Sequence, residues 1–60
     1  MKYKLDYHFF DGYTNVYDSI ILSVFNPYKP YDAVDYISQV IKIDPDNIFI
    51  DGYVPLGLFA

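Results

Sequence analysis

Few side chains in this sequence could take part in catalysis. The chain holds one imidazole, that of His8, and no cysteine. A hydrolytic triad would require His8 to meet a serine, with an aspartate to orient the ring. We expect His8 and Ser19 to lie on paired strands, but a chain this short is not expected to form a pocket large enough for a substrate. The sequence therefore predicts a protein without enzymatic activity.

An acidic stretch late in the sequence bears a superficial likeness to a calcium-binding loop. Asp44-Pro45-Asp46-Asn47 is followed by Asp51-Gly52. A calcium loop needs oxygen ligands at a fixed alternating spacing and a distant glutamate, and this chain contains no glutamate. Aspartate, proline and asparagine are common turn residues. The stretch predicts a capped turn, and neither a metal ion nor another cofactor is expected.

The ionised side chains are of two kinds, eight aspartates and four lysines, which give a net charge of −4. This charge repels the phosphates of nucleic acids and of anionic membrane surfaces. It favours a basic partner, such as the DNA-facing groove of an enzyme. Direct binding of nucleic acid or of a membrane is therefore not expected.

The segment that begins at Asp18 and Ser19 has the most specific chemistry. A carboxylate and a hydroxyl at the edge of a strand can imitate a DNA phosphate and its hydrogen-bonding surroundings. Apolar neighbours such as Ile20 can then receive a protein side chain that normally enters the duplex. A plain strand break accounts for the same residues, because Asp and Ser are common where a ladder is interrupted.

Asp18-Ser19-Ile20-Ile21 resembles the segment that phage uracil-DNA glycosylase inhibitors insert into the DNA groove of their target. Tyr28-Lys29-Pro30-Tyr31 is similar to a stretch of one such inhibitor. The resemblance is confined to these two segments, and Asp18 stands where those inhibitors carry a glutamate. It implies a small acidic inhibitor, encoded by a phage, that mimics DNA and blocks a host DNA-processing enzyme, with uracil-DNA glycosylase the leading candidate.

The predicted partner-binding residues are aromatic, acidic or edge-strand side chains: Asp6, Tyr13, Tyr17, Asp18, Ser19, Ile20 and Tyr28. A DNA mimic requires its carboxylates to gather on one side of the molecule at phosphate-like separations. The alternative is a self-associating adaptor or structural module that binds through an aromatic sheet face, and its carboxylates would be scattered. The carboxylates that distinguish the two classes are Asp6, Asp11, Asp18 and Asp51.

Residues 2–10 alternate between apolar and polar side chains, which predicts a half-buried strand. Its apolar face would consist of Tyr3, Leu5, Tyr7 and Phe9. Asp11-Gly12 predicts a two-residue hairpin turn, and residues 13–25 predict the return strand.

That two-residue turn would place Asp18 opposite Leu5, on the apolar face of the hairpin. A β-bulge is therefore expected at Asp18-Ser19, to correct the register. Beyond the bulge, the side chains expected to face the core are those of Ile20, Leu22 and Val24.

A helix is predicted to begin at Asp32, as N-cap, with Asp35 in the capping-box position. Apolar residues then recur at helical spacing, at Ala33, Tyr36, Ile37, Val40 and Ile41, which predicts an amphipathic helix that packs through this stripe. The residue before Pro45 avoids helical geometry, so the helix ends there.

Residues 48–54 predict the last strand, with a kink at Asp51-Gly52. The fold expected is a single small α+β domain of residues 1–60. It has β-β-α-β order, a three-stranded antiparallel sheet of spatial order 2-1-3, and one helix packed on one face. The other face would have no layer to cover it, and aromatic side chains are expected to project there from Phe10, Tyr13 and Tyr17.

Aromatic residues make up 22% of the chain, more than a core this small requires. Two explanations stay open, an interface with a partner or a second copy, and a crowded core. A domain of this size is close to the lower limit for independent folding, so burial against another chain would stabilise it and a homodimer is expected. The tail of residues 55–60 is either an ordered arm or a contact strip.

No apolar run reaches the length of a membrane span. The alternating start of the sequence lacks the apolar middle of a signal peptide. A cytoplasmic location is expected, in the host cytoplasm if the chain is encoded by a phage.

Overall fold

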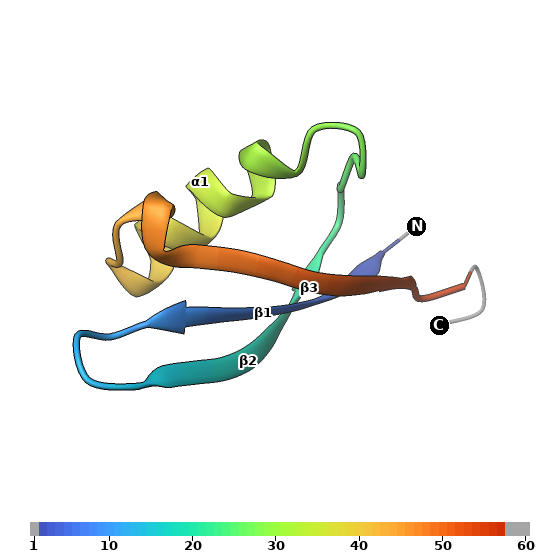
Figure 1. The fold of residues 1–60 in the computed structure, drawn as a ribbon. Coiled ribbons are helices and arrows are strands. Elements are labelled where there is room, and N and C mark those ends of the chain that lie inside the picture. The colour runs from blue at the N-terminus through green and yellow to red at the C-terminus, as the bar shows by residue number, and fades with distance from the viewer. Residues whose placement is uncertain (1, 58–60) are drawn as a thin grey trace.

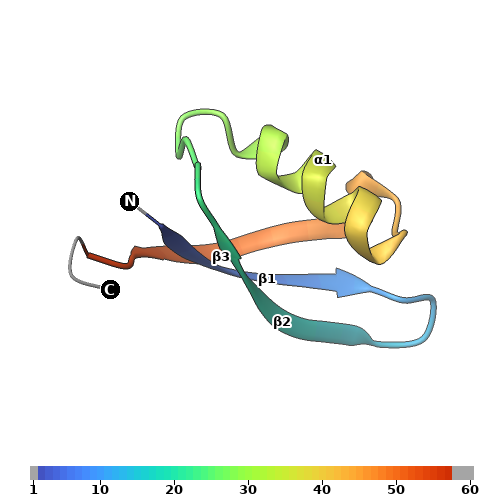
Figure 2. The same cartoon turned by 180° about the vertical axis from the view of Figure 1, so that it is seen from behind.

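The computed structural model describes residues 2–57, which form three strands, one α-helix and one 3₁₀ turn (Figure 1). In chain order the elements are β1 (Tyr3–Phe10), β2 (Asn15–Leu22), α1 (Pro30–Ile41), η1 (Pro45–Asn47) and β3 (Ile48–Pro55). The sheet is antiparallel with strand order β2-β1-β3, and α1 lies on one side of it, closest to β3. The predicted α+β fold and strand order are confirmed. Among the described residues no element covers the opposite side of the sheet (Figure 2).

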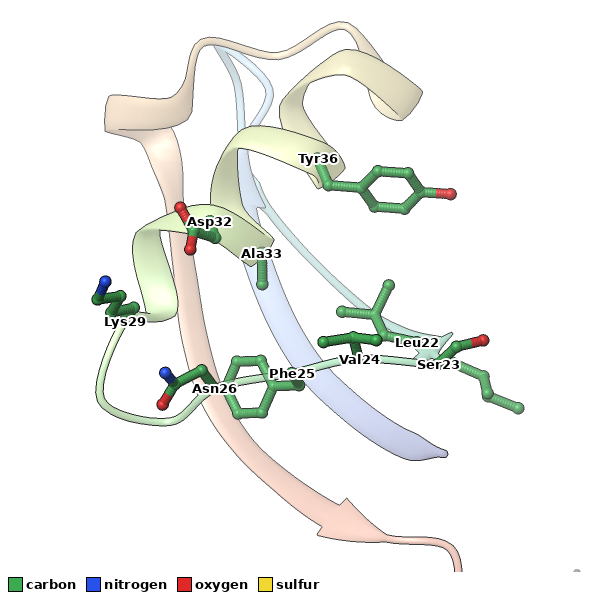
Figure 3. Close-up of a pocket in the computed structure, with 10 residues that line it drawn as sticks. Leu22, Ser23, Val24, Phe25, Asn26, Lys29, Asp32, Ala33 and Tyr36 are labelled. Carbon is green, nitrogen blue, oxygen red and sulfur yellow. The ribbon is translucent and has the colours of Figure 1, made fainter. Parts of the chain in front are cut away.

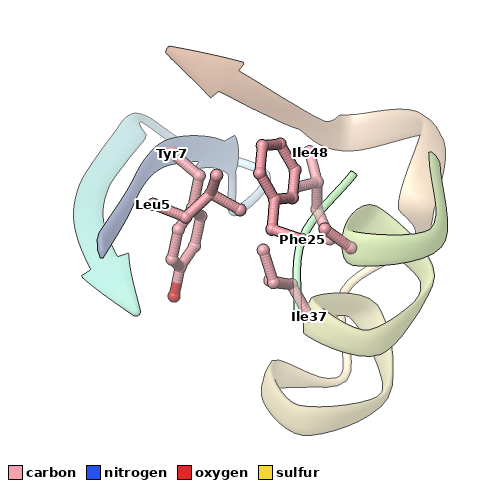
Figure 4. Packing of buried hydrophobic residues seen from close by; sticks show 6 residues of the cluster. Leu5, Tyr7, Phe25, Ile37 and Ile48 are labelled. Carbon is pink, nitrogen blue, oxygen red and sulfur yellow. The ribbon is translucent and has the colours of Figure 1, made fainter. Parts of the chain in front are cut away.

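The core lies between β1 and α1 (Figure 4). Leu5 and Tyr7 are buried on β1, while the intervening Lys4 and Asp6 are exposed, because successive side chains of a strand point to opposite sides. Ile37 of α1 is fully buried against this face. The buried cluster consists of Leu5, Tyr7, Phe25, Ala33, Ile37 and Ile48.

The connection between β1 and β2 is four residues long, not the two predicted. The Asp11 carboxylate accepts hydrogen bonds from the backbone N–H groups of Tyr13 and Thr14, both at 2.8 Å, and Asp11 N–H donates to the Thr14 carbonyl. Gly12 has φ of +103°, a conformation that L side chains rarely adopt. The side chain of Asp11 thus closes a wider loop than the Asp-Gly pair alone would form.

The longer loop changes the register of the hairpin. Tyr7 pairs with Asp18 and Leu5 with Ile20, in a ladder that runs without interruption to the end of β2. The predicted bulge at Asp18-Ser19 is therefore wrong. Asp18 is tolerated on the helix side because β2 is an edge strand and the carboxylate stays exposed to solvent.

The irregularity of the sheet lies instead in β3. Asp6 pairs with Gly52 and Tyr7 with Ile50, so Asp51 has no partner in β1. One extra residue in a strand reverses the side-chain alternation beyond it. The kink predicted at Asp51-Gly52 is this bulge.

The core assignment at the end of β2 differs from the sequence prediction. β2 ends at Leu22, Val24 is exposed, and Phe25 enters the core instead. Phe25 packs against the rings of Tyr3 and Tyr53, with centroid distances of 5.9 and 5.1 Å. The chain leaves the sheet after Leu22, so strand alternation no longer decides which side chain points inward.

The helix begins earlier than predicted, at Pro30. This proline occupies its first turn, Lys29 precedes it without a side-chain cap, and Asp32 lies inside the first turn, so the predicted N-cap is wrong. Proline suits this position because its missing N–H would have no helical partner there. Lys42 ends the helix in the left-handed conformation, with φ of 60°.

The packed stripe of α1 is narrower than its apolar pattern. Ala33 and Ile37 are buried, whereas Tyr36 and Val40 are about half exposed. Val34 and Ile41 are partly buried beside the core. A helix laid on a twisted sheet buries only the side chains directed at the strands, and Tyr36 and Val40 lie at the margin of that contact.

The different burial of Ile37 and Val40 predicts different costs of truncation. Ile37→Ala should lower the free energy of unfolding by about 2–5 kcal/mol, and Val40→Ala by about 0.5 kcal/mol or less. Chemical denaturation of the two variants measures both. If Ile37→Ala does not fold, Ile37→Val should cost about 0.5–1.5 kcal/mol. Equal effects at the two positions would contradict the packing of α1.

The hairpin loop predicts a dependence of stability on acid. The backbone hydrogen bonds from Thr14 and Tyr13 lower the pKa of Asp11 below its ordinary value of 3.8. A carboxyl group with a lowered pKa stabilises the fold above its ordinary pKa, and this contribution is lost as the pH falls through the folded value. Asp11→Asn keeps an acceptor oxygen but cannot titrate. The stability difference between wild type and Asp11→Asn should therefore shrink as the pH is lowered below about 4, and a constant difference would contradict the loop geometry.

Candidate binding surface

Among the described residues no element covers the side of the sheet opposite α1. We call it the open face. Cross-strand pairing and strand alternation assign its side chains. β1 contributes Lys4, Asp6, His8 and Phe10, β2 contributes Asn15, Tyr17, Ser19 and Ile21, and β3 contributes Phe49, Asp51 and Val54, with Gly52 between them.

A row of three rings crosses the open face. His8 lies at its centre, on the middle strand, with the ring centroid of Tyr17 at 5.0 Å and that of Phe49 at 5.1 Å. The His8 and Phe49 rings are nearly parallel, at 22°. Cross-strand aromatic contacts of this kind stabilise the pairing of neighbouring strands. The ring contacts therefore link all three strands and hold the exposed rings of Tyr17 and Phe49 on either side of His8.

The bulge of β3 completes this site. Both oxygens of the Asp51 carboxylate lie within hydrogen-bonding distance of His8 Nδ1, at 2.8 and 2.9 Å. A carboxylate ion can only accept, so Nδ1 carries the hydrogen. Because Asp51 has no partner in β1, its side chain is free to turn toward His8. The pair fixes the orientation of the imidazole within the ring row.

The open face exposes apolar side chains on all three strands. Tyr17 is 70% exposed, Ile21 60%, and Phe10, Phe49 and Val54 between 44% and 53%. A fully buried aromatic residue removes roughly 150–250 Å² from water, so these five side chains together present an apolar surface on the order of 500 Å². Exposed apolar area of this size lies at the upper end of what the largest patch on a typical monomer presents, and such patches are often functional.

The predicted partner-binding residues do not form one surface. Asp6, Tyr17 and Ser19 lie together on the open face, where Asp6 and Ser19 are direct cross-strand partners. Ile20 points to the opposite side, where it packs against the core. Tyr13 lies in the hairpin loop and is 93% exposed. Two predicted residues remain, and both lie away from the open face: Asp18 on the helix side of β2, and Tyr28 in the loop before α1.

Asp18 lies beside the buried phenol of Tyr7, its cross-strand partner. Burial raises the pKa of Tyr7, and the negative charge of Asp18 raises it further. The Asp18 carboxylate also accepts a hydrogen bond from the backbone N–H of Ser19, at 2.8 Å. This local contact holds the carboxylate close to its own strand.

The four carboxylates that distinguish the two classes of binding protein are divided among three places. Asp6 and Asp51 lie on the open face, Asp18 lies on the helix side, and Asp11 lies in the hairpin loop with its oxygen bound to backbone N–H groups. A DNA backbone presents its phosphates along continuous lines. The distribution in this chain is scattered.

A groove of about 480 Å³ lies between α1 and the segment that follows β2 (Figure 3). Apolar side chains line most of it, among them Leu22, Val24, Phe25, Ala33 and Tyr36. Its charged side chains are Lys29 and Asp32, at the start of α1. The expectation that no pocket of ligand size would form is wrong, because α1 leans toward β3 and leaves this side of the core open. The groove contains no imidazole and no paired carboxylates among the described residues that line it.

Two further properties of residues 2–57 bear on the class of protein. No helix in this range is long and apolar enough to cross a membrane. These residues also contain no group of three or more His, Cys, Asp or Glu side chains arranged to hold a metal ion.

Sequence reasoning missed the role of His8 and the contribution of β3 to the open face. Phe49 and Val54 are separated by an odd number of positions and would lie on opposite sides of a regular strand. The bulge at Asp51 brings them to the same side. The Asp-Gly pair at 51–52 is the available signal, since glycine inside a strand often marks a bulge.

Comparison with known proteins finds no matching family model, no similar curated protein and no similar solved structure. The function is therefore inferred from the geometry of the chain.

The contact between His8 and Asp51 predicts the tautomer of the imidazole. Neutral His8 should carry its hydrogen on Nδ1, because Asp51 accepts there, and Nε2 should be unprotonated. The ¹⁵N chemical shifts of the ring nitrogens, measured above neutral pH, distinguish the two tautomers. Asp51→Ala removes the acceptor and should reduce the Nδ1–H population. A wild-type imidazole with its hydrogen on Nε2 would contradict the contact.

Proposed function

We propose that the protein is a small binding module that acts on another protein through the open face. The observation that carries the proposal is the uncovered apolar surface that Tyr17, Ile21 and Phe49 expose around the His8–Asp51 pair. Tyrosine is enriched at the energetic centres of protein interfaces. The proposal places the protein in the cytoplasm, where it is made.

The chemistry of the open face favours a protein over a nucleic acid. The net charge of −4 repels phosphate groups that come within a Debye length of the protein. The face itself carries Lys4 against Asp6 and Asp51, so it lacks the basic groove that a single-stranded nucleic acid would need beside aromatic rings. Its mixture of exposed rings with a few charges is typical of the centre and rim of a protein interface.

DNA mimicry is the second candidate, and one observation favours it. Ser19 is exposed on the edge strand β2 with Asp6 as its direct cross-strand partner, so one carboxylate lies beside one hydroxyl on the open face, and the exposed Asp18 follows on the other side of the same edge strand. This arrangement supports an inhibitor that offers its β2 edge to a phosphate-binding groove of a host DNA-processing enzyme, with uracil-DNA glycosylase the leading candidate. The positions of Asp11 in the hairpin loop and Asp18 on the helix side, away from Asp6 and Asp51, favour the open-face module instead.

The open face can be tested with two matched double variants. Tyr17→Thr with Ile21→Thr removes two apolar side chains from the open face, and Tyr36→Gln with Val40→Gln removes two of similar exposure from α1. Each replacement suits its element, so both proteins should fold. A protein partner captured by the wild-type bait should be lost by the open-face variant and retained by the α1 variant. Loss with the α1 variant alone would overturn the proposal.

The inhibitor candidate predicts a measurable block of DNA repair. Uracil excision from a labelled duplex by a bacterial uracil-DNA glycosylase should slow when this protein is in excess. Asp18→Asn should weaken the block about tenfold or more, because a charge-assisted hydrogen bond contributes about 1.5–3 kcal/mol, and added salt should weaken it further. Unimpeded excision at micromolar protein would exclude this target.

A further inference from the structure

We infer that the occupant of the open face is a second copy of this chain, packed face to face with the first across a two-fold axis that runs perpendicular to the strands. The inference deepens the proposed function and rests on it, since it names the partner of the same surface. Three properties of the open face support it: its area, its charges and the heights of its side chains.

The area matches what a stable dimer requires. A standard interface buries about 800 Å² on each partner, of which roughly 56–65% is apolar. The five exposed apolar side chains of the open face present roughly 500 Å², and polar side chains surround them on the same three strands. One copy therefore supplies apolar and polar area in the proportions that one half of an interface needs.

The charges of the open face are ordered along the strands. Lys4 lies near one end of β1, between Ile21 and Val54. Asp6 follows two residues further along, between Ser19 and Gly52, and the His8–Asp51 pair lies beyond it. The face is thus positive at one end and negative from its middle onward. A symmetric contact requires such a surface to complement itself.

This order selects the direction of the axis. An axis parallel to β1 would place Lys4 of each copy against Lys4 of the other. An axis that crosses the strands level with Leu5, midway between Lys4 and Asp6, reverses the order of the rows, so that Lys4 of one copy lies over Asp6 of the other. The contact between Lys4 and Asp6 forms twice in the dimer, once with the lysine of each copy. Only the second arrangement pairs unlike charges.

The distances to which the side chains project from the sheet fit the same axis. The row of Ser19, Asp6 and Gly52 is low, because it holds a glycine and a serine. Rows of larger side chains flank it, Ile21 and Val54 on one side and Tyr17 and Phe49 on the other. An axis level with Leu5 places the Ile21 and Val54 row of one copy over the low row of Ser19, Asp6 and Gly52 of the other. Sheets that pack face to face bury interdigitated side chains of this kind.

Sedimentation equilibrium of wild type and of two charge-reversed variants tests the inference. Wild type should dimerise at micromolar concentration. Lys4→Glu and Asp6→Lys should each weaken self-association by about tenfold or more, because each places like charges in contact twice. An equimolar mixture of the two variants should recover the dimer. In the mixed dimer the introduced glutamate of one chain meets the introduced lysine of the other, and the remaining contact is that of wild type.

Asp6→Lys should fold, because the Asp6 side chain is exposed and forms no hydrogen bond within the described residues. Recovery in the mixture supports the two-fold arrangement. A wild-type chain that stays monomeric at millimolar concentration, or single variants that dimerise as tightly as wild type, would overturn it. In that case the proposed function stands if the open-face variant still loses a captured protein that the α1 variant retains.

Discussion

The rest of the structure depends on one constraint, that a sheet has two sides and this chain supplies one helix. Ile37 and Ala33 of α1 bury Leu5 and Tyr7 on one side of β1, and this packing forms the core. Twelve helical residues cannot also cover the far side. The sheet must therefore leave Tyr17, Phe49 and the other open-face side chains in contact with water or with another molecule, and exposure of that much apolar surface favours association.

The open face has specific contacts between its side chains that a surface merely left uncovered by the fold would not need. The bulge at Asp51 interrupts the ladder of β3, which removes a pairing contact. In return the carboxylate orients His8, and Phe49 joins Val54 on the open side. Bulges commonly redirect side chains beside functional sites. An irregularity that gathers aromatic and charged groups on one uncovered side is consistent with a binding surface.

The sequence predicts the fold more completely than the surface. Alternation over β1 and the helical spacing of Ala33 and Ile37 identify the elements, and the crossover through the helix lets the last strand pair with the first. The register is less accessible, because it depends on the hydrogen bonds of the Asp11 side chain, which composition does not reveal. The β3 bulge follows from backbone geometry, and without it Phe49 and Val54 cannot be placed on one face. Short-range sequence chemistry groups Asp18, Ile20 and Tyr28 with the other predicted site residues, whereas the fold places Asp18 and Ile20 on the helix side and Tyr28 in the loop before α1.

The central claim is that the open face is the surface through which this chain binds. The most direct measurement is a dilution series followed by the backbone amide resonances in two-dimensional ¹H–¹⁵N spectra. Resonances of open-face residues such as Tyr17, His8 and Phe49 should shift with concentration, while those of α1 stay constant. Shifts confined to α1 and the groove beside it, with an unchanged open face, would contradict the account.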